Sequence, residues 1–121
     1  MKIAVSYDHG TVFNHFGRTK QFKVYDTEDE SVKTTWVVDA PEQNKFMLVG
    51  FLKGIGADVL ICGKIGREAR QMLSDRNIQI IAGASGNADT AIDLFLHDQL
   101  KDDASAVCSG EKSGSSRKTG V

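Results

Sequence analysis

Residues 59–66, Val-Leu-Ile-Cys-Gly-Lys-Ile-Gly, are the stretch that decides the fold. The first four of them, residues 59–62, are apolar and are typical of a short strand buried on both faces. A turn with two glycines follows, and residues 65–76 then carry apolar side chains at the spacing of an amphipathic helix. This order predicts part of a parallel strand–helix–strand unit, in which helices pack on a sheet.

The same pattern continues on both sides of this stretch. Residues 78–82 form a second short apolar run and are predicted to be a strand. Residues 43–55 and 87–100 carry apolar side chains at helical spacing, which predicts a helix in each. Asn87 or Ser85 could cap the last helix, because both side chains accept hydrogen bonds from helix N–H groups.

The N-terminal part of the chain is rich in strand signals. Residues 2–7 are apolar and predict a buried first strand, whereas residues 21–27 alternate between apolar and polar. Residues 32–38 are β-branched and aromatic, and the short polar turn before them predicts an antiparallel hairpin. The complete order is β-β-β-α-β-α-β-α. We therefore expect an α/β protein with a mixed five-stranded sheet and three helices.

Composition limits the classes of protein that this chain can be. A length of 121 residues suggests one domain, predicted here as residues 1–100. Residues 101–121 are rich in Ser, Gly, Lys and Asp and are expected to form a disordered polar tail. The formal net charge of -1 indicates no nucleic-acid or membrane partner, and no apolar run approaches the length of a membrane helix. Two cysteines cannot make a disulfide framework, so a cytoplasmic protein without a signal peptide is expected.

Three of the predicted strands end in connections that contain glycine. If these strands are parallel, all three connections lie at the same carboxyl edge of the sheet, where open α/β sheets bind ligands. Two of the connections lead into helices, whose N-terminal N–H groups attract anions. The connections are residues 8–20 after the first strand, residues 63–67 after the fourth and residues 83–87 after the fifth.

Charged and ligating side chains fall in these connections. Arg18, Lys64 and Arg67 add positive charge, and His15 can ligate a metal when neutral or donate to an anion when charged. The sequence therefore predicts an anion-binding cradle with a histidine at its rim. The simpler alternative is that His15 caps a turn by hydrogen bonding and that the three cations are ordinary solvated charges.

The two cysteines are further candidate metal ligands. Cys62 ends the fourth strand at the predicted edge, although cysteine at such a position is most often a small buried hydrophobe. Cys108 lies in the predicted tail, where it is either inert or an exchangeable thiolate ligand. Neither phosphate-loop fingerprint is present in the chain, and no trio of carboxylates indicates a two-metal nuclease.

Several segments together resemble the nitrogenase iron–molybdenum cofactor biosynthesis family, which includes NifX-like proteins, the carboxyl-terminal domain of NifB and the orange proteins. The segments are MKIAVSYD, HFGR, FKVYD and GADVLICGKIG, followed by a glycine turn and a final helix. The resemblance covers about residues 1–100 and implies a ribonuclease H-like fold. It also implies an accessory protein, not an enzyme, that binds or carries an anionic metal–sulfur cluster. Such a cluster would be the iron–molybdenum cofactor, its precursor or another Mo/Fe–S species.

The resemblance transfers to particular residues of this chain. It implies His15 as the metal ligand, and Lys64 stands where another glycine is usual. Some members end in a tail with several histidines, but this tail keeps Cys108 and has no histidine. The predicted cofactor-binding residues are Phe16, Gly17, Arg18, Gly63, Lys64, Gly66 and Arg67, and the predicted metal ligands are His15, Cys62 and Cys108.

Three hypotheses about function follow. The first is a non-enzymatic carrier of a metal–sulfur cluster, with nitrogenase or cofactor-assembly proteins as partners. The second is a small-anion or nucleotide-binding regulatory module that uses the same cradle without a metal. The third is an interaction domain that has no ligand. A thiometallate cluster absorbs visible light and a nucleotide does not, so colour separates the first two hypotheses.

Overall fold

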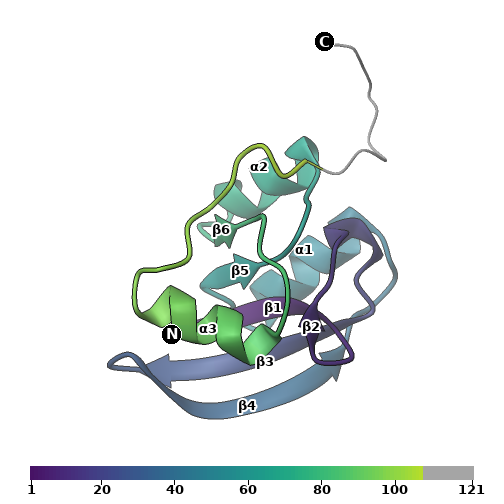
Figure 1. The fold of residues 1–121 in the computed structure, drawn as a ribbon. Coiled ribbons are helices and arrows are strands. Elements are labelled where there is room, and N and C mark those ends of the chain that lie inside the picture. The colour runs from purple at the N-terminus through teal and green to yellow at the C-terminus, as the bar shows by residue number, and fades with distance from the viewer. Residues whose placement is uncertain (108–121) are drawn as a thin grey trace.

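One mixed sheet with helices on both of its faces forms the centre of the computed structural model, which describes residues 1–107 (Figure 1). The strand order is β4-β3-β1-β5-β6, and β2 pairs with β1 outside this path. The strands are β1 (Lys2–Asp8), β2 (Thr11–Val12), β3 (Gln21–Glu28), β4 (Ser31–Asp39), β5 (Val59–Ile61) and β6 (Gln79–Ile81). The helices are the short 3₁₀ turn η1 (Phe16–Arg18), α1 (Lys45–Gly54), α2 (Arg67–Asp75) and α3 (Ala88–Leu96).

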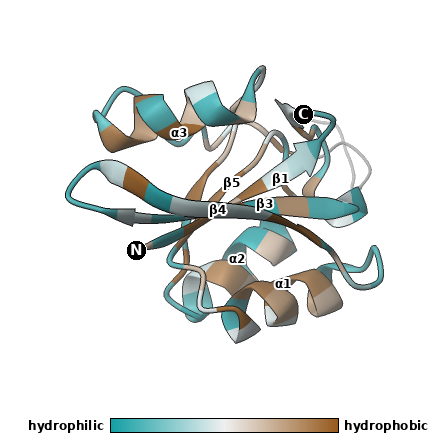
Figure 2. Cartoon of the chain, turned by 90° about the horizontal axis from the view of Figure 1, so that it is seen from below, coloured by the Kyte–Doolittle hydropathy of each residue, from teal (hydrophilic) through white to brown (hydrophobic). Residues whose placement is uncertain are grey.

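The sheet separates two hydrophobic cores. Helix α3 covers one face and helices α1 and α2 cover the other, as Figure 2 shows. Strand β1 supplies both cores, because Ala4 packs toward α1 and α2 whereas Ile3 and Val5 pack toward α3. All three of these side chains are fully buried. This burial on both faces explains why the central strands are apolar runs without alternation.

Strand directions agree with the expectations from sequence. Strands β1, β5 and β6 are parallel, and β3 and β4 form the antiparallel hairpin. The α/β class and the three helices are confirmed. The expected count of five strands was wrong by one, because the two-residue β2 also pairs with β1. The finer ribonuclease H-like designation stays a prediction.

The helices are shorter than their sequence patterns suggest. The last helix ends at Leu96, not at Leu100, and Asp98 just beyond it has a positive φ of 58°. Asn87 caps this helix as expected, since its side chain accepts a hydrogen bond from the Thr90 N–H. None of the helices described in residues 1–107 is long and apolar enough to cross a membrane.

Residues 101–107 differ from the expected polar tail. Asp102 accepts hydrogen bonds from the Arg70 guanidinium at 2.7 and 3.1 Å and from the Ala82 N–H at 2.9 Å. Ala106 packs against the core on the α1 and α2 side. We call residues 101–107 the strap, because they bind α2 and the end of β6. Residues 108–121 lie outside the described part of the chain, so the disordered tail stays a prediction there.

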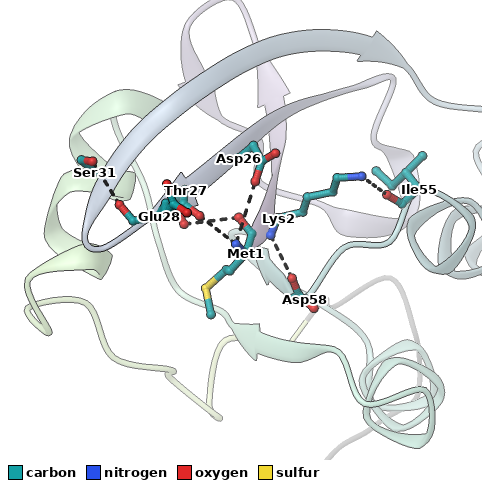
Figure 3. A network of polar contacts seen from close by, with 8 residues as sticks. All are labelled: Met1, Lys2, Asp26, Thr27, Glu28, Ser31, Ile55 and Asp58. Carbon is teal, nitrogen blue, oxygen red and sulfur yellow. Dashed lines mark hydrogen bonds and ion pairs between the residues drawn. The ribbon is translucent and has the colours of Figure 1, made fainter.

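The amino edge of the sheet is closed by a separate polar network (Figure 3). Met1 and Thr27 exchange two backbone hydrogen bonds, both 2.8 Å long. Lys2 and Asp58 make a second pair of contacts, in which the Lys2 N–H donates to the Asp58 carboxylate at 2.9 Å. The Lys2 ammonium donates to the carbonyl of Ile55 at the C-terminal end of α1, where the helix dipole favours a cation. This edge is therefore occupied by contacts within the protein.

A buried tyrosine attaches α3 to the sheet. The Tyr25 hydroxyl donates to the Asp89 carboxylate at 2.5 Å, and the Lys23 ammonium lies 2.9 Å from the same oxygen. These hydrogen bonds, from Tyr25 first and Lys23 second, lower the pKa of Asp89 below its ordinary value of 3.8.

Tyr25→Phe is therefore expected to reduce the free energy of unfolding by about 1–2 kcal/mol, as for the loss of a hydrogen bond to a charged group. The same change should raise the pKa of Asp89. Urea denaturation and an NMR titration of the carboxyl carbon measure the two effects. Tyr7→Phe, on the half-buried Tyr7 ring, is the control. Unchanged values for both quantities in Tyr25→Phe would contradict the assignment.

Candidate functional site

The loop that contains His15 is hydrogen bonded to the turn after β5. The Lys64 N–H donates to the Asn14 carbonyl at 2.7 Å, and the Lys64 carbonyl accepts from the Phe16 N–H at 3.0 Å. This is a parallel β-bridge between His15 and Lys64. Paired positions on adjacent strands are about 4.8 Å apart and their side chains emerge on the same side. The fold therefore brings the expected metal ligand and an expected cation into neighbouring positions.

Gly63 makes this close approach possible. A Cβ atom at position 63 would lie 2.9 Å from the Asn14 Cα and 3.0 Å from the Phe13 carbonyl oxygen, closer than real Cβ contacts. The Gly63 N–H donates to the Phe13 carbonyl at 3.2 Å, and its carbonyl accepts from the Gly83 N–H at 2.7 Å. The three glycine-containing connections thus meet at Gly63.

The first and third connections also contact each other directly. The Val12 N–H donates to the Gly86 carbonyl at 2.8 Å, and the Ala88 N–H donates to the Gly10 carbonyl at 2.9 Å. Convergence of all three connections at one edge, predicted from the parallel strands, is therefore confirmed. Convergence does not by itself show that a ligand binds there.

A buried aromatic ring and a buried hydroxyl hold the η1 turn in place. Phe16 is 1% exposed and packs against Phe22, with the ring centroids 6.3 Å apart. The Thr19 hydroxyl donates to the Phe16 carbonyl at 2.7 Å. Phe16 was expected to contact the cofactor, but its side chain lies in the core and anchors the loop instead. Sequence reasoning missed Thr19, because one threonine after Arg18 carries no periodic signal.

His15 is half-buried and its backbone is fixed at two points. Its carbonyl accepts a hydrogen bond from the Arg18 N–H at 3.0 Å, which closes the η1 turn. Its ring lies edge-on to Phe13, with the ring centroids 6.4 Å apart. The imidazole is therefore held at the rim of the convergent connections, with part of its surface open to solvent.

The expected cations lie on the surface. Arg18, Lys64 and Arg67 are all exposed. Each belongs to a different local element: Arg18 ends η1, Lys64 pairs with the His15 loop and Arg67 begins α2. Long flexible cations in such positions can reach a bound anion, and they leave no buried charge when the anion is absent.

The backbone amides of the turn have a different role from the expected one. The N–H groups of Gly63, Lys64 and Ile65 all donate to protein carbonyls, the last one to Ala106 of the strap at 3.1 Å. They hold the connections together and are not available to cradle an anion. The remaining amide donors are those at the start of α2. Gly66, its N-cap residue, makes no side-chain cap hydrogen bond among the described residues.

Cys62 has the properties of a core residue. Its side chain is fully buried, and burial raises the pKa of its thiol to about 12. Metal binding requires a thiolate, so this environment disfavours the expected ligand role. Cys108, the other expected cysteine ligand, lies outside the described residues. Within residues 1–107, no group of three or more His, Cys, Asp and Glu side chains is arranged to hold a metal ion.

The other two histidines pair with their own neighbours. His9 contacts the Asp8 carboxylate through Nδ1 at 2.6 Å, and its side chain is almost fully exposed. His97 contacts the Asp93 carbonyl through Nδ1 at 2.8 Å at the end of α3. Neither is brought to the meeting point of the connections by the contacts that hold His15.

Comparison with known proteins supports the assignment of a family. A protein of Methanocaldococcus jannaschii, MJ0580, is 26% identical over 106 residues, which cover 84% of this chain and 90% of that protein. The crystal structure of PH0822 has a TM-score of 0.80 and 30% identity, and the match covers 93% of this chain and all of that one. The apo form of the orange protein from Desulfovibrio gigas has a TM-score of 0.73 and 26% identity, with 85% and 92% covered. The model of the dinitrogenase iron–molybdenum cofactor family matches residues 1–98, so the chain belongs to this family.

Proposed function

We propose that this protein binds and carries an anionic metal–sulfur cluster as an accessory protein in cofactor assembly, without catalysing a reaction. The cluster would be the iron–molybdenum cofactor, its precursor or a related Mo/Fe–S species. Membership of the dinitrogenase iron–molybdenum cofactor family supports this proposal. The observation that carries it is the bridge that places His15 beside Lys64 at the meeting point of three connections.

In this proposal the imidazole of His15 ligates one metal of the cluster. Arg18, Lys64 and Arg67 neutralise the negative sulfides, because charge-assisted contacts to an anion are stronger than neutral ones. Gly17 gives the loop close backbone approach, and Gly63 and Gly66 shape the turn. Few protein ligands suit a carrier, since the cluster must later leave.

Cys108 is the second ligand that we propose. The strap ends at Val107, and the neighbouring Ala106 is hydrogen bonded to Ile65 in the turn. The residue that follows Val107 in the sequence is therefore attached close to the turn. Nitrogenase or cofactor-assembly proteins would be the partners that deliver or receive the cluster.

Reconstitution of the full chain tests this function. We would mix purified apo-protein anaerobically with iron–sulfide and thiomolybdate species, and record visible spectra and bound metal after gel filtration. We expect stoichiometric colour in the native protein and at least a ten-fold weaker affinity in His15→Ala, about 1.4 kcal/mol or more. His97→Ala, which removes an exposed histidine, is the matched control and should bind normally.

The variants also separate the proposed ligands. Cys108→Ser should weaken binding, whereas Cys62→Ala should leave it unchanged, since Cys62 is buried in the core. Absence of retained metal in every protein would contradict the carrier function. Colour that is unchanged in His15→Ala would move the site away from this loop.

A regulatory module for small anions or nucleotides is the second candidate function. The three exposed cations and the uncapped start of α2 favour it, because both attract anions without a metal. Calorimetric titration with phosphate and with nucleotides tests it. Binding of these anions by protein that stays colourless with iron–sulfide and thiomolybdate would support this module over the carrier.

A further inference from the structure

Strand β4 lies at one end of the sheet with its outer edge open. Within the described residues, β4 pairs with β3 only. Nearly all of its nine residues are exposed, including the large apolar side chains of Trp36, Val37 and Val32, each 40–45% exposed. A long exposed edge strand with apolar side chains is a template for pairing with another strand.

Backbone hydrogen bonds define which groups of β4 point outward. The Ala40 N–H donates to the Lys20 carbonyl, which is on the β3 side of the hairpin. Hydrogen-bonded positions alternate along an antiparallel pair, and the register continues through Val38 opposite Phe22. The even positions of residues 34–40 therefore bond to β3. The N–H and carbonyl groups of residues 33, 35, 37 and 39 face the open edge.

This edge is complementary to itself. If two copies of β4 are placed antiparallel about a two-fold axis at Trp36, the two Trp36 side chains lie opposite each other. Thr35 then lies opposite Val37 of the second copy, and both positions present outward backbone groups that can exchange hydrogen bonds. In the same register Lys33 lies opposite Asp39 of the second copy. The symmetry produces this opposite-charge pair twice.

We propose that a second copy of this chain pairs with the β4 edge in this register and forms a homodimer with one continuous sheet. Trp36 lies on the sheet face covered by α1 and α2, because it is paired with the core residue Val24. The Trp36 pair is a non-hydrogen-bonded one, in which opposite Cα atoms are only about 4.5 Å apart, so the rings can pack.

The pairing leaves both candidate functional sites accessible. Strand β4 runs parallel to β1, since each is antiparallel to β3. Antiparallel pairing of two β4 strands therefore places the two His15 loops at opposite edges of the continuous sheet. Each site would load independently of the other, and dimerisation would not depend on His15.

Charge exchange at positions 33 and 39 tests the register. Sedimentation velocity and Trp36 fluorescence would be measured on the full chain from about 1 µM to about 1 mM, since a single strand pair makes a small interface. Trp36 is the single tryptophan of the chain, so its emission reports on this contact directly. We expect a concentration-dependent dimer with a blue shift of that emission.

Lys33→Asp or Asp39→Lys alone should raise the dissociation constant about ten-fold or more, because each turns two attractive pairs into two repulsive ones. The double exchange Lys33→Asp/Asp39→Lys should restore association, which also shows that the single variants do not act by unfolding. Lys101→Asp makes the same change of net charge on another exposed lysine and should dimerise normally.

A chain that stays monomeric to about 1 mM with constant Trp36 emission would overturn the proposal, and the edge would then be open to a different strand. A dimer that is insensitive to the single exchanges would also overturn it, because its interface would lie elsewhere.

Discussion

Gly63→Ala is expected to lower the free energy of unfolding by about 2–3 kcal/mol, as for an added methyl in a space that cannot give. The atoms that a Cβ would meet are backbone atoms of Phe13 and Asn14, at 2.9–3.1 Å. Backbone cannot rotate away as a flexible side chain can. The loop must therefore separate from the turn, and the three hydrogen bonds between the loop and residues 63 and 64 weaken together.

The same substitution should reduce cluster binding, since His15 is held beside Lys64 by this contact. Urea denaturation measures the stability, and metal retention measures the binding. Gly50→Ala is the matched control, because it adds the same methyl on an exposed helix position with open space around it. The control should be stabilised by about 0.5–1 kcal/mol. A Gly63→Ala protein as stable as the native one would show that the loop is not held in this way.

Asp102→Ala should lower the free energy of unfolding by about 2–3 kcal/mol, the second largest effect. The change removes both hydrogen bonds from Arg70 and leaves the N–H of Ala82, which is 1% exposed, without its acceptor. Most of the loss comes from that buried donor, because the Arg70 pair is partly exposed. Urea denaturation checks the size of the effect. A loss below about 0.5 kcal/mol would contradict it, as this is the range of ordinary surface changes.

The acid dependence of stability gives a second readout of Asp102. Burial acts to raise the pKa of this carboxyl, but the hydrogen bonds from Arg70 and Ala82 outweigh it, so the pKa lies below the ordinary value of 3.8. A depressed pKa contributes stability above the unfolded value and loses it as pH falls through the folded value. Asp102→Asn should therefore show a weaker loss of stability with acid than the native chain. Asp98→Asn, on an exposed carboxyl, is the control and should leave the acid dependence unchanged.

The parts of the fold that sequence reasoning predicted are those with a repeating signal. Apolar runs marked β1, β5 and β6, and helical spacing marked α1, α2 and α3. The two-residue β2 was missed because Thr11 and Val12 are too short to show a period. The strap was missed because its contacts join Asp102 to Arg70 and Ala106 to Ile65, far apart in sequence. Such pairs leave no local pattern.

The site shows the same division. Convergence of the connections followed from the parallel strands, and the structure confirms it. The role of each group did not follow, because it depends on which partner lies opposite in space. Phe16 proved to be an anchor in the core, and the amide of Gly63 proved to be bonded to Phe13. The ligand roles of His15 and Cys108 stay predictions, which the reconstitution tests.

The hydrogen bond between Ile65 and Ala106 has a practical consequence for handling the protein. Whatever is joined behind Val107, such as an affinity tag or a fluorescent label, starts next to the entrance where cargo would arrive. Met1 lies at the opposite edge of the sheet, where its nitrogen donates to the Thr27 carbonyl. A peptide N–H at that nitrogen can make the same bond. Purification handles for loading assays therefore belong at the N-terminus, where they leave the entrance clear.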